Sequence, residues 1–246
     1  MFETLFYQPI LNLLIWLYDV IPGQDLGIAI ILLTIIIKIL LYSLNSKQIK
    51  SQKELQELQP KIEEVKNKYK DSKEEMGKKM MELYKEHKVN PFGSCLPLLI
   101  QMPFLFALFR VFRDGFEDGA LKLIYPFIHN PETINYISFG FLDLSKKNIY
   151  IAILAALAQF WQAKMMMSKK TEVKGSDSKN EDMAAIMNKQ MVYFMPVMTF
   201  FMASSFSAGL ALYWLVTTLL SAFQQLYILK KKNNPKSKII EGELIS

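Results

Sequence analysis

The chain has 246 residues, of which 51% are hydrophobic, yet it carries 29 Lys and Arg against 23 Asp and Glu. The charged and the apolar residues occupy separate blocks, and this segregation excludes the even mixture of a soluble globular domain. The single cysteine, Cys95, excludes an internal disulfide framework and a cysteine-based metal site within one chain.

The apolar blocks predict an all-α polytopic membrane protein with five transmembrane helices. A helical span needs about 20 apolar residues, and stretches without Asp, Glu, Lys or Arg cover 26–46 (apart from Lys38), 89–109, 148–163 and 190–229. The last is long enough for two crossings. The predicted spans are 26–46, 89–113, 148–167, 191–204 and 207–229. Between and around them we expect an extracytoplasmic interfacial helix and elbow (1–25), a cytosolic coiled-coil hairpin (47–88), an extracytoplasmic loop (114–147), a cytosolic loop (168–190) and a basic cytosolic tail (230–246).

The lysines predict the orientation. Segment 47–88 holds twelve lysines, 168–190 holds five and the tail after 229 holds five, whereas 1–25 holds none and 114–147 holds three against five acids. Because basic loops stay in the cytosol, the N-terminus is expected outside and the C-terminus in the cytosol. We expect a bacterial inner-membrane location.

Residues 2–19 predict a helix that lies in the membrane interface. Its polar residues Thr4, Gln8, Asn12 and Asp19 trace one stripe, and apolar and aromatic residues fill the remainder. The alternative is a frayed apolar terminus.

The first span contains one charge, Lys38, about 12 Å from its cytosolic end. An ionised lysine at such a position costs at least about 2.5–3.5 kcal/mol on insertion scales. Thr34 and Asn45 share its helical face. We interpret Lys38 as the charge of a hydrated groove that is open to the cytosol; the alternative is a side chain that only snorkels to the headgroups.

The segment 47–88 predicts two antiparallel helices joined by a polar turn near Asp71 and Ser72. Apolar residues recur at 3-4 spacing in both arms, which is typical of a coiled-coil seam; they are Leu55, Leu58, Ile62, Val65, Tyr69, Met76, Met80 and Leu83. Pro60 is expected to kink the first arm. The hairpin is expected to be mobile and to assist capture of a ligand.

The remaining segments are less patterned. The outer segment 114–147 predicts a loop with short surface helices, 168–190 predicts a flexible connection that becomes helical near Asp182, and the tail predicts disorder. The tail lysines either attract ribosomal RNA or anionic lipid, or only fix the topology.

The predicted spans contain no Asp, Glu or His, so Lys38 has no carboxylate partner there, and no phosphate-binding loop occurs in the chain. These features argue against an enzyme, a proton relay and an ATP-driven step. The polar residues that remain are mostly expected to form interhelical hydrogen bonds; they are Gln101, Gln159, Gln162, Thr199, Thr217, Thr218, Gln224 and Gln225. Together they are candidates to line a cavity. No metal and no cofactor are expected.

Three stretches resemble one known family. They read LQPKIEEVKNKYKD, MMELYKEHKVNPFGSCLPLLIQMPFLFALF and FMPVMTFFMASSFSAGLALYWLVTTLLSAFQQ. Their content and order resemble the conserved core of the YidC/Oxa/Alb membrane protein insertases, from about residue 7 to 230. The chain is expected to be a minimal YidC-like form without a large periplasmic domain.

The resemblance implies a five-helix bundle with a hydrophilic groove that is open to the cytosol and to lipid. Lys38 falls where the family usually has a groove arginine, Thr34, Gln101 and Gln159 become candidates to line the groove, and Tyr213 and Trp214 become client-contacting aromatics. The implied function is that of a membrane protein insertase and chaperone. The implied partners are nascent membrane proteins, the lipid bilayer, and also the ribosome and the Sec translocon. No nucleotide is implied.

The sequence departs from the family pattern at three places. Lys38 replaces the arginine, Ser207 and Ala208 stand where a proline often precedes Gly209, and Thr218 replaces an asparagine. The rival functions are a small-solute transporter or channel, which predicts an internal repeat and ionisable groups at the membrane midplane, and a structural scaffold, which leaves Lys38 unexplained.

Overall fold

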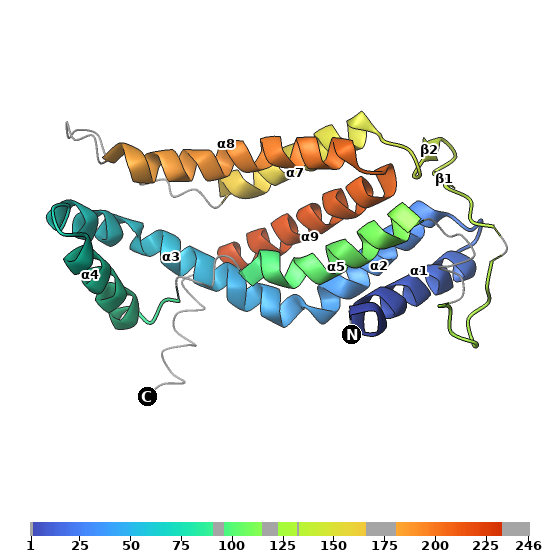
Figure 1. Ribbon diagram of the computed structural model, residues 1–246, viewed down its shortest axis with the longest axis horizontal. Coiled ribbons are helices and arrows are strands. Elements are labelled where there is room, and N and C mark those ends of the chain that lie inside the picture. The colour runs from blue at the N-terminus through green and yellow to red at the C-terminus, as the bar shows by residue number, and fades with distance from the viewer. Residues whose placement is uncertain (1, 91–95, 115–122, 132, 166–180, 233–246) are drawn as a thin grey trace.

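The computed structural model is an elongated, almost entirely helical molecule (Figure 1). It describes residues 2–90, 96–114, 123–131, 133–165 and 181–232. Its elements are the short π-helix η1 (Glu3–Tyr7) and α1 (Gln8–Val20), α2 (Leu26–Leu40), α3 (Tyr42–Lys68), α4 (Lys73–Glu86), α5 (Leu96–Asp114), β1 (Ile137–Ser138), β2 (Leu142–Asp143), α7 (Ile149–Met165), α8 (Glu181–Ser205) and α9 (Ala208–Lys232). The predicted helical class is confirmed. Cys95 and the tail beyond residue 232 lie outside the described residues.

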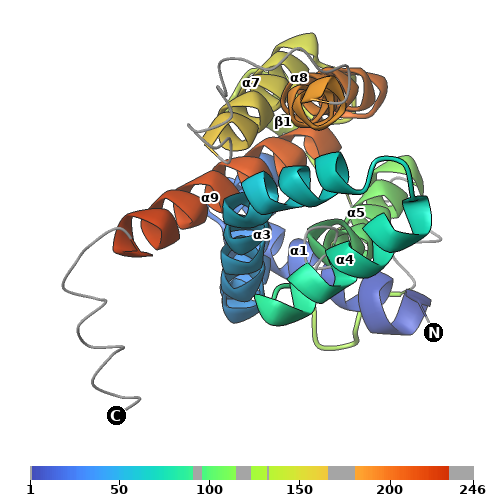
Figure 2. The same cartoon turned by 90° about the vertical axis from the view of Figure 1, so that its left-hand side faces the viewer.

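The helices surround α9. Figure 2 shows α7 and α8 side by side on one side of α9, and α1 and α5 on the other. One continuous cluster of buried apolar side chains joins α1, α2, α5, α7 and α9. Leu11, Leu33, Leu108 and Leu210 are at most 2% exposed and mark its centre. This cluster therefore fixes how α2, which carries Lys38, sits against α9.

Helix α7 has the residue distribution of a helix in lipid. Its buried side contains Ala152 and Ala155, whereas Ile153, Leu154 and Leu157 on its other side are 41–58% exposed. Small residues let helices approach closely in a membrane, and large apolar residues face the lipid. A soluble protein would place these two kinds of residue the other way round.

Length and composition identify fewer spans than the sequence predicts. Among the described residues, Ala208–Lys230 of α9 is long and apolar enough to cross a membrane, and α2 with α3 counts as a second span if the bent pair is one. Ile149–Met165 and Val192–Ser205 are shorter apolar helices. The five-span count therefore stays a prediction.

The apolar helix α2 ends six residues before the end of the predicted first span. Leu41 interrupts it, and α3 continues at an angle of 70°. The break has no proline or glycine, the usual causes of a sharp kink. It leaves Lys38 in the last turn of α2, next to the bend.

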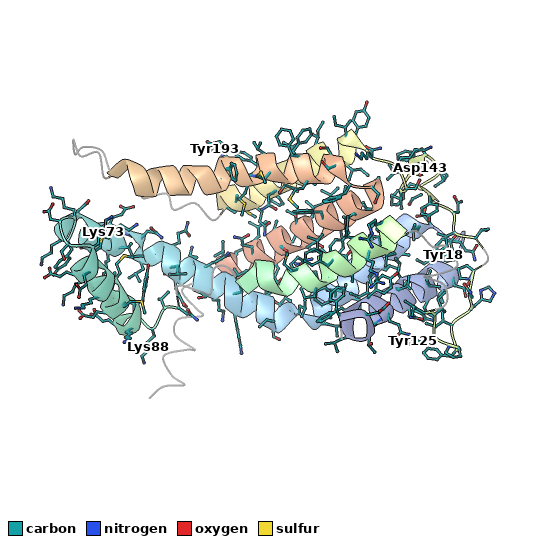
Figure 3. All side chains as sticks on the ribbon, in the orientation of Figure 1. Tyr18, Lys73, Lys88, Tyr125, Asp143 and Tyr193 are labelled. Atoms are coloured by element: carbon teal, nitrogen blue, oxygen red, sulfur yellow. The ribbon has the colours of Figure 1, made fainter. Side chains whose placement is uncertain are left out.

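Helices α3 and α4 pack against each other through the predicted apolar stripes. Leu58 and Ile62 of α3 are buried together with Val89, and four further side chains pack against them; these are Leu55, Met80, Leu83 and Tyr84. Helix α3 continues through Pro60 without an interruption. Figure 3 shows Lys73 and Lys88 in this hairpin at one end of the molecule, far from Tyr18 and Tyr125 at the other.

The polar stripe of α1 binds the outer segment of the chain. The Asn12 amide nitrogen donates to the Leu123 carbonyl (2.9 Å), and its amide oxygen accepts from the Tyr125 backbone N–H (2.6 Å). Gln8 also donates to the Leu123 carbonyl (3.1 Å). Asn12 is 1% exposed. Within this stripe, Asn12 therefore makes an interior contact with the outer segment.

In the described part of the outer segment, turns and a small antiparallel sheet occur instead of the expected short surface helices. Ile137 pairs with Asp143, and Ser138 pairs with Leu142. The short strands pack against the beginning of α2, and the Leu144 carbonyl accepts the Gly209 N–H of α9 (3.0 Å). The outer segment thus connects the beginnings of α2 and α9.

Asp25 ties this sheet to α2. As the N-cap of the helix it accepts from the backbone N–H groups of Gly27 (2.8 Å) and Ile28 (3.1 Å), and it also accepts from the Phe139 N–H (2.7 Å) and the Ser138 hydroxyl. Burial acts to raise the pKa of Asp25, but the Ser138 hydroxyl and three backbone amides outweigh it and lower the pKa below its ordinary value.

Replacing Asp25 by alanine is expected to destabilise the protein by about 1–2 kcal/mol at neutral pH, the cost of losing an N-cap. Because the folded pKa is lowered, the contribution is complete above the unfolded value of about 4 and disappears as the pH falls through the folded value. Thermal unfolding in detergent between pH 7 and 2 measures this. The gap between wild type and variant should close only below about pH 4. Asp71→Ala, at an exposed position, is the control.

Candidate functional site

The candidate site is built around Lys38. Its ammonium donates to the Ser221 hydroxyl of α9 (2.7 Å), and this hydroxyl donates in turn to the Thr217 carbonyl (2.7 Å). Lys38 is partly exposed. Within the described ranges no ion pair joins it to a carboxylate. Among the described residues, the group that holds the Lys38 side chain is therefore a neutral hydroxyl.

A polar ladder on α9 faces the helices around Lys38. We use this name for Tyr213, Thr217, Ser221 and Gln224, which are spaced by four, four and three residues and so share one side of the helix. Ser221 reaches Lys38 on α2. Gln224 donates to the Tyr42 carbonyl (3.0 Å) and to the Ser46 hydroxyl (3.0 Å) on α3.

The ladder therefore supports the bend between α2 and α3 from both sides. Ser221 contacts α2 before the bend, and Gln224, about one turn further along α9, contacts α3 after it. The Ser46 hydroxyl also donates to the Tyr42 carbonyl (2.8 Å), so the first turn of α3 is closed on itself as well. The Lys38 side chain and the first turn of α3 are thus both held by α9.

At its other end the ladder contacts α5. The Gln101 amide donates to the Tyr213 hydroxyl. Tyr213 is only 2% exposed, whereas Trp214 beside it is half-buried. Two predicted site residues are thus brought together. Tyr213 is buried in this structure, and the client-contacting role of both aromatics stays a prediction.

Two other predicted site residues lie differently. Thr34 is 1% exposed, and its hydroxyl donates its hydrogen to the Ile30 carbonyl of its own helix (2.6 Å). Gln159 is half-buried on α7, and among the described residues no hydrogen bond connects it to Lys38. Their roles in lining a groove stay predictions.

Within the part of the chain that the structure describes, three buried side-chain donors near the bend have no hydrogen-bond partner. They are the Thr217 hydroxyl of the ladder and the side-chain amides of Asn45 and Gln48 on α3. Leaving a buried donor unsatisfied costs about 1–3 kcal/mol. These groups are therefore ready to bind water or a polar group of another molecule. The sequence identified Thr217, Gln101 and Gln224 as candidates but missed Ser221.

The arrangement offers electrostatic attraction and hydrogen bonding. Among the described residues no group of three or more His, Cys, Asp or Glu could hold a metal ion. A hollow between α3 and α4 is lined by charges of both signs, including Glu64, Lys79 and Glu82, and Lys79 pairs with Glu82 (2.7 Å). It lies in the hairpin, away from Lys38.

A helical bundle in which α7 buries alanines and exposes large apolar side chains, with a lysine held by a hydroxyl of a polar ladder, defines a membrane protein with a polar interior site. Comparison with known proteins agrees. The model of the 60Kd inner membrane protein family matches residues 16–236, and the chain belongs to this family.

Individual relatives are bacterial proteins named membrane protein insertase YidC. The one from Fusobacterium nucleatum is 38% identical over 207 residues, which are 84% of this chain and 87% of that protein. Those from Geobacter metallireducens (36% over 225 residues) and Syntrophus aciditrophicus (38% over 226 residues) each match 91% of this chain. The chain spans only 36% of the length of these two proteins.

Proposed function

We propose that the protein is an insertase and chaperone for membrane proteins, and that Lys38 with the polar ladder forms the polar side of a groove open to the cytosol and to lipid. The observation that carries the proposal is the contact of Lys38 with a hydroxyl instead of a carboxylate. A cation without a counter-ion, next to unpartnered donors, attracts an anionic or carbonyl-rich segment. The names of the relatives support the same activity.

In this proposal the groove transiently holds the polar outer tail of a client while the client's apolar helix moves into lipid along the bundle. Moving polar groups through hydrocarbon is costly unless they find hydrogen-bond partners. Thr217, Asn45 and Gln48 supply such partners, and burial of the client's apolar surface drives the process. No nucleotide is required, in agreement with the absence of a phosphate-binding loop from the sequence.

The orientation and the further partners belong to the same proposal. The N-terminus lies outside and the C-terminus in the cytosol, so the hairpin of α3 and α4 projects into the cytosol and assists client capture. Its few apolar contacts outside its own seam favour the mobility that this role needs. Contact with the ribosome or the Sec translocon stays a prediction.

The test is insertion of a single-span client with an acidic outer tail into liposomes that contain only this protein and no nucleotide. We expect insertion well above that into empty liposomes, measured as protection of the tail from an added protease. A client whose tail acids are replaced by asparagine and glutamine is expected to insert less efficiently, because Lys38 then attracts it less.

A dye enclosed in the same liposomes tests the rival function. A small-solute transporter or channel releases the dye, or a smaller solute, without inserting the client. Solute release without client insertion would contradict the insertase proposal. The predicted spans contain no Asp or Glu to serve ion coupling, which also argues against this rival.

A further inference from the structure

The small β1–β2 hairpin presents large apolar side chains on its outer face, beside the carboxylate of Asp143, which lies opposite Ile137. Ser138 and Leu142 on its inner side are at most 8% exposed. On its outer side Ile137 is 45%, Phe139 43% and Phe141 82% exposed. Large apolar side chains gathered on the outside of a tight turn are unusual for a loop that faces water only.

The turn presents these rings at a conformational cost. Phe139 has φ +52° and Gly140 has φ +78°. Glycine adopts such angles freely, but for a bulky aromatic residue they are unfavourable. A strained residue of this kind points to a role for the side chain that occupies the position.

Three backbone N–H groups of the hairpin are bound from within the protein. The Phe139 N–H donates to the Asp25 carboxylate (2.7 Å), the Phe141 N–H to the Ser138 carbonyl (3.2 Å) and the Ile137 N–H to the Asn135 side-chain oxygen (2.9 Å). Unsatisfied backbone groups are what makes irregular chain costly in an apolar medium. With these three amides paired, the tip can leave water at little cost.

The hairpin is also fixed to the amino-terminal end of α2, where the first predicted span begins. The Gly27 N–H, in the first turn of α2, donates to the Ser138 hydroxyl (3.1 Å). Figure 1 shows β1 and β2 at the ends of the helices, next to the start of α7, and Figure 3 places Asp143 at the same end.

The apolar surface of the tip leads toward the lipid-facing side of α7. Its first residues, Ile149 and Tyr150, are 54% and 75% exposed, and the exposed side chains continue along the helix. The exposed Lys146 and Lys147 lie between the tip of the hairpin and α7 in the chain. Their positive charges are attracted by phosphate headgroups. Lys146 also pairs with Asp143 (2.9 Å).

We infer that the β1–β2 hairpin is an aromatic anchor for the lipid–water interface at the amino-terminal end of α2. Phe139 and Phe141 lie among the headgroups and the first acyl carbons, where aromatic side chains are favoured. Because Asp25 and Ser138 join the hairpin rigidly to α2, the anchor fixes how deep α2 sits and thereby the depth of Lys38. This inference does not depend on the insertase activity.

The experiment measures the depth of a nitroxide label in liposomes that contain only this protein. Cys95 is replaced by serine, and single cysteines for labelling are introduced by Phe141→Cys and by three reference substitutions. Leu157→Cys on α7 is the lipid reference, and the exposed Asn130→Cys at the same end and Lys70→Cys in the α3–α4 turn are the water references. Collision rates with oxygen and with a water-soluble nickel chelate are measured for each.

For the label at 141 we expect an oxygen-to-nickel collision ratio severalfold above that at 130 and below that at 157. Phe141 is 82% exposed, so this substitution leaves the fold intact. A ratio equal to those at 130 and 70 would place the tip in water and overturn the inference. Low collision rates with both reagents would show that protein, such as a second copy of the chain, covers the tip, and would also overturn it.

Discussion

Lys38→Glu is expected to abolish insertion of the acidic-tail client. The substitution replaces the attraction of the tail by repulsion, and a like-charge contact in a partly desolvated site costs several kcal/mol. Since each 1.4 kcal/mol changes an equilibrium tenfold, the expected loss is about 100-fold or more. Lys38→Ala removes the attraction without adding repulsion and is expected to lose less. Lys38→Arg keeps the charge and should retain most of the activity. Protease protection of the tail in liposomes measures all three.

Matched variants separate the charge from the hydrogen bond it makes. Ser221→Ala removes the hydroxyl that holds Lys38 but leaves the ammonium in place, so activity should fall only slightly. Lys47→Glu makes the same charge inversion at an exposed position on α3 and should insert like the wild type. A client with a basic tail should partly restore insertion by Lys38→Glu. Equal activity of the alanine, glutamate and arginine variants at 38 would remove this charge from the mechanism.

The sequence contains enough information to predict Ser221 as the partner of Lys38. The predicted topology makes α2 and α9 run in the same direction through the membrane. Lys38 is 12 residues after Leu26, the first residue of α2, and Ser221 is 13 residues after Ala208, the first residue of α9. Counting from the helix starts therefore places both at one depth. Ser221 at this depth is therefore a candidate partner of Lys38 that the sequence and the predicted topology together indicate.

The seam between α3 and α4 has a clear signal in the local sequence, whereas the bend between α2 and α3 has none. The 3-4 spacing of Leu55, Leu58 and Ile62 predicted the hairpin seam because the period itself encodes the buried side. The 70° bend at Leu41 has no such signal, because contacts from Gln224 to Tyr42 and Ser46 support it, and these residues are about 180 positions apart. Long-range hydrogen bonds of this kind are not readable from local pattern.

The outer segment shows the same limit. The polar stripe of α1 is visible in the sequence, but the partners of Gln8 and Asn12 are backbone groups of Leu123 and Tyr125, and backbone groups leave no trace in composition. The β1–β2 hairpin was missed because each strand has only two residues, too few for an alternation pattern. Phe139 also occupies a turn position with a positive φ, where glycine or asparagine is the residue that usually indicates a turn in a sequence.

Gly209→Ala is expected to destabilise the bundle by about 1–3 kcal/mol, the usual cost of overpacking. A Cβ at this position would lie 2.3 Å from Cε1 and 2.4 Å from Cζ of Phe112, distances at which atoms must move apart. Gly209 is the second residue of α9, and Phe112 belongs to the last turns of α5, so the contact sets how closely these helices approach there. Thermal unfolding in detergent should show a lowered midpoint for the variant.

A double-mutant cycle attributes the effect to this contact. Phe112→Leu removes both ring atoms that the new methyl group would meet, so Gly209→Ala should cost less in the Phe112→Leu background than alone, by about 0.5–3 kcal/mol. Gly77→Ala makes the same substitution in α4, where nothing lies within 4 Å, and should stabilise by about 0.5–1 kcal/mol through helix propensity alone. If Gly209→Ala also stabilised the protein, or if Phe112→Leu left its cost unchanged, the close approach of α5 and α9 at Gly209 would be wrong. The same result would also put the position of the polar ladder in question, because Gly209 and the ladder residues lie on the same helix, α9.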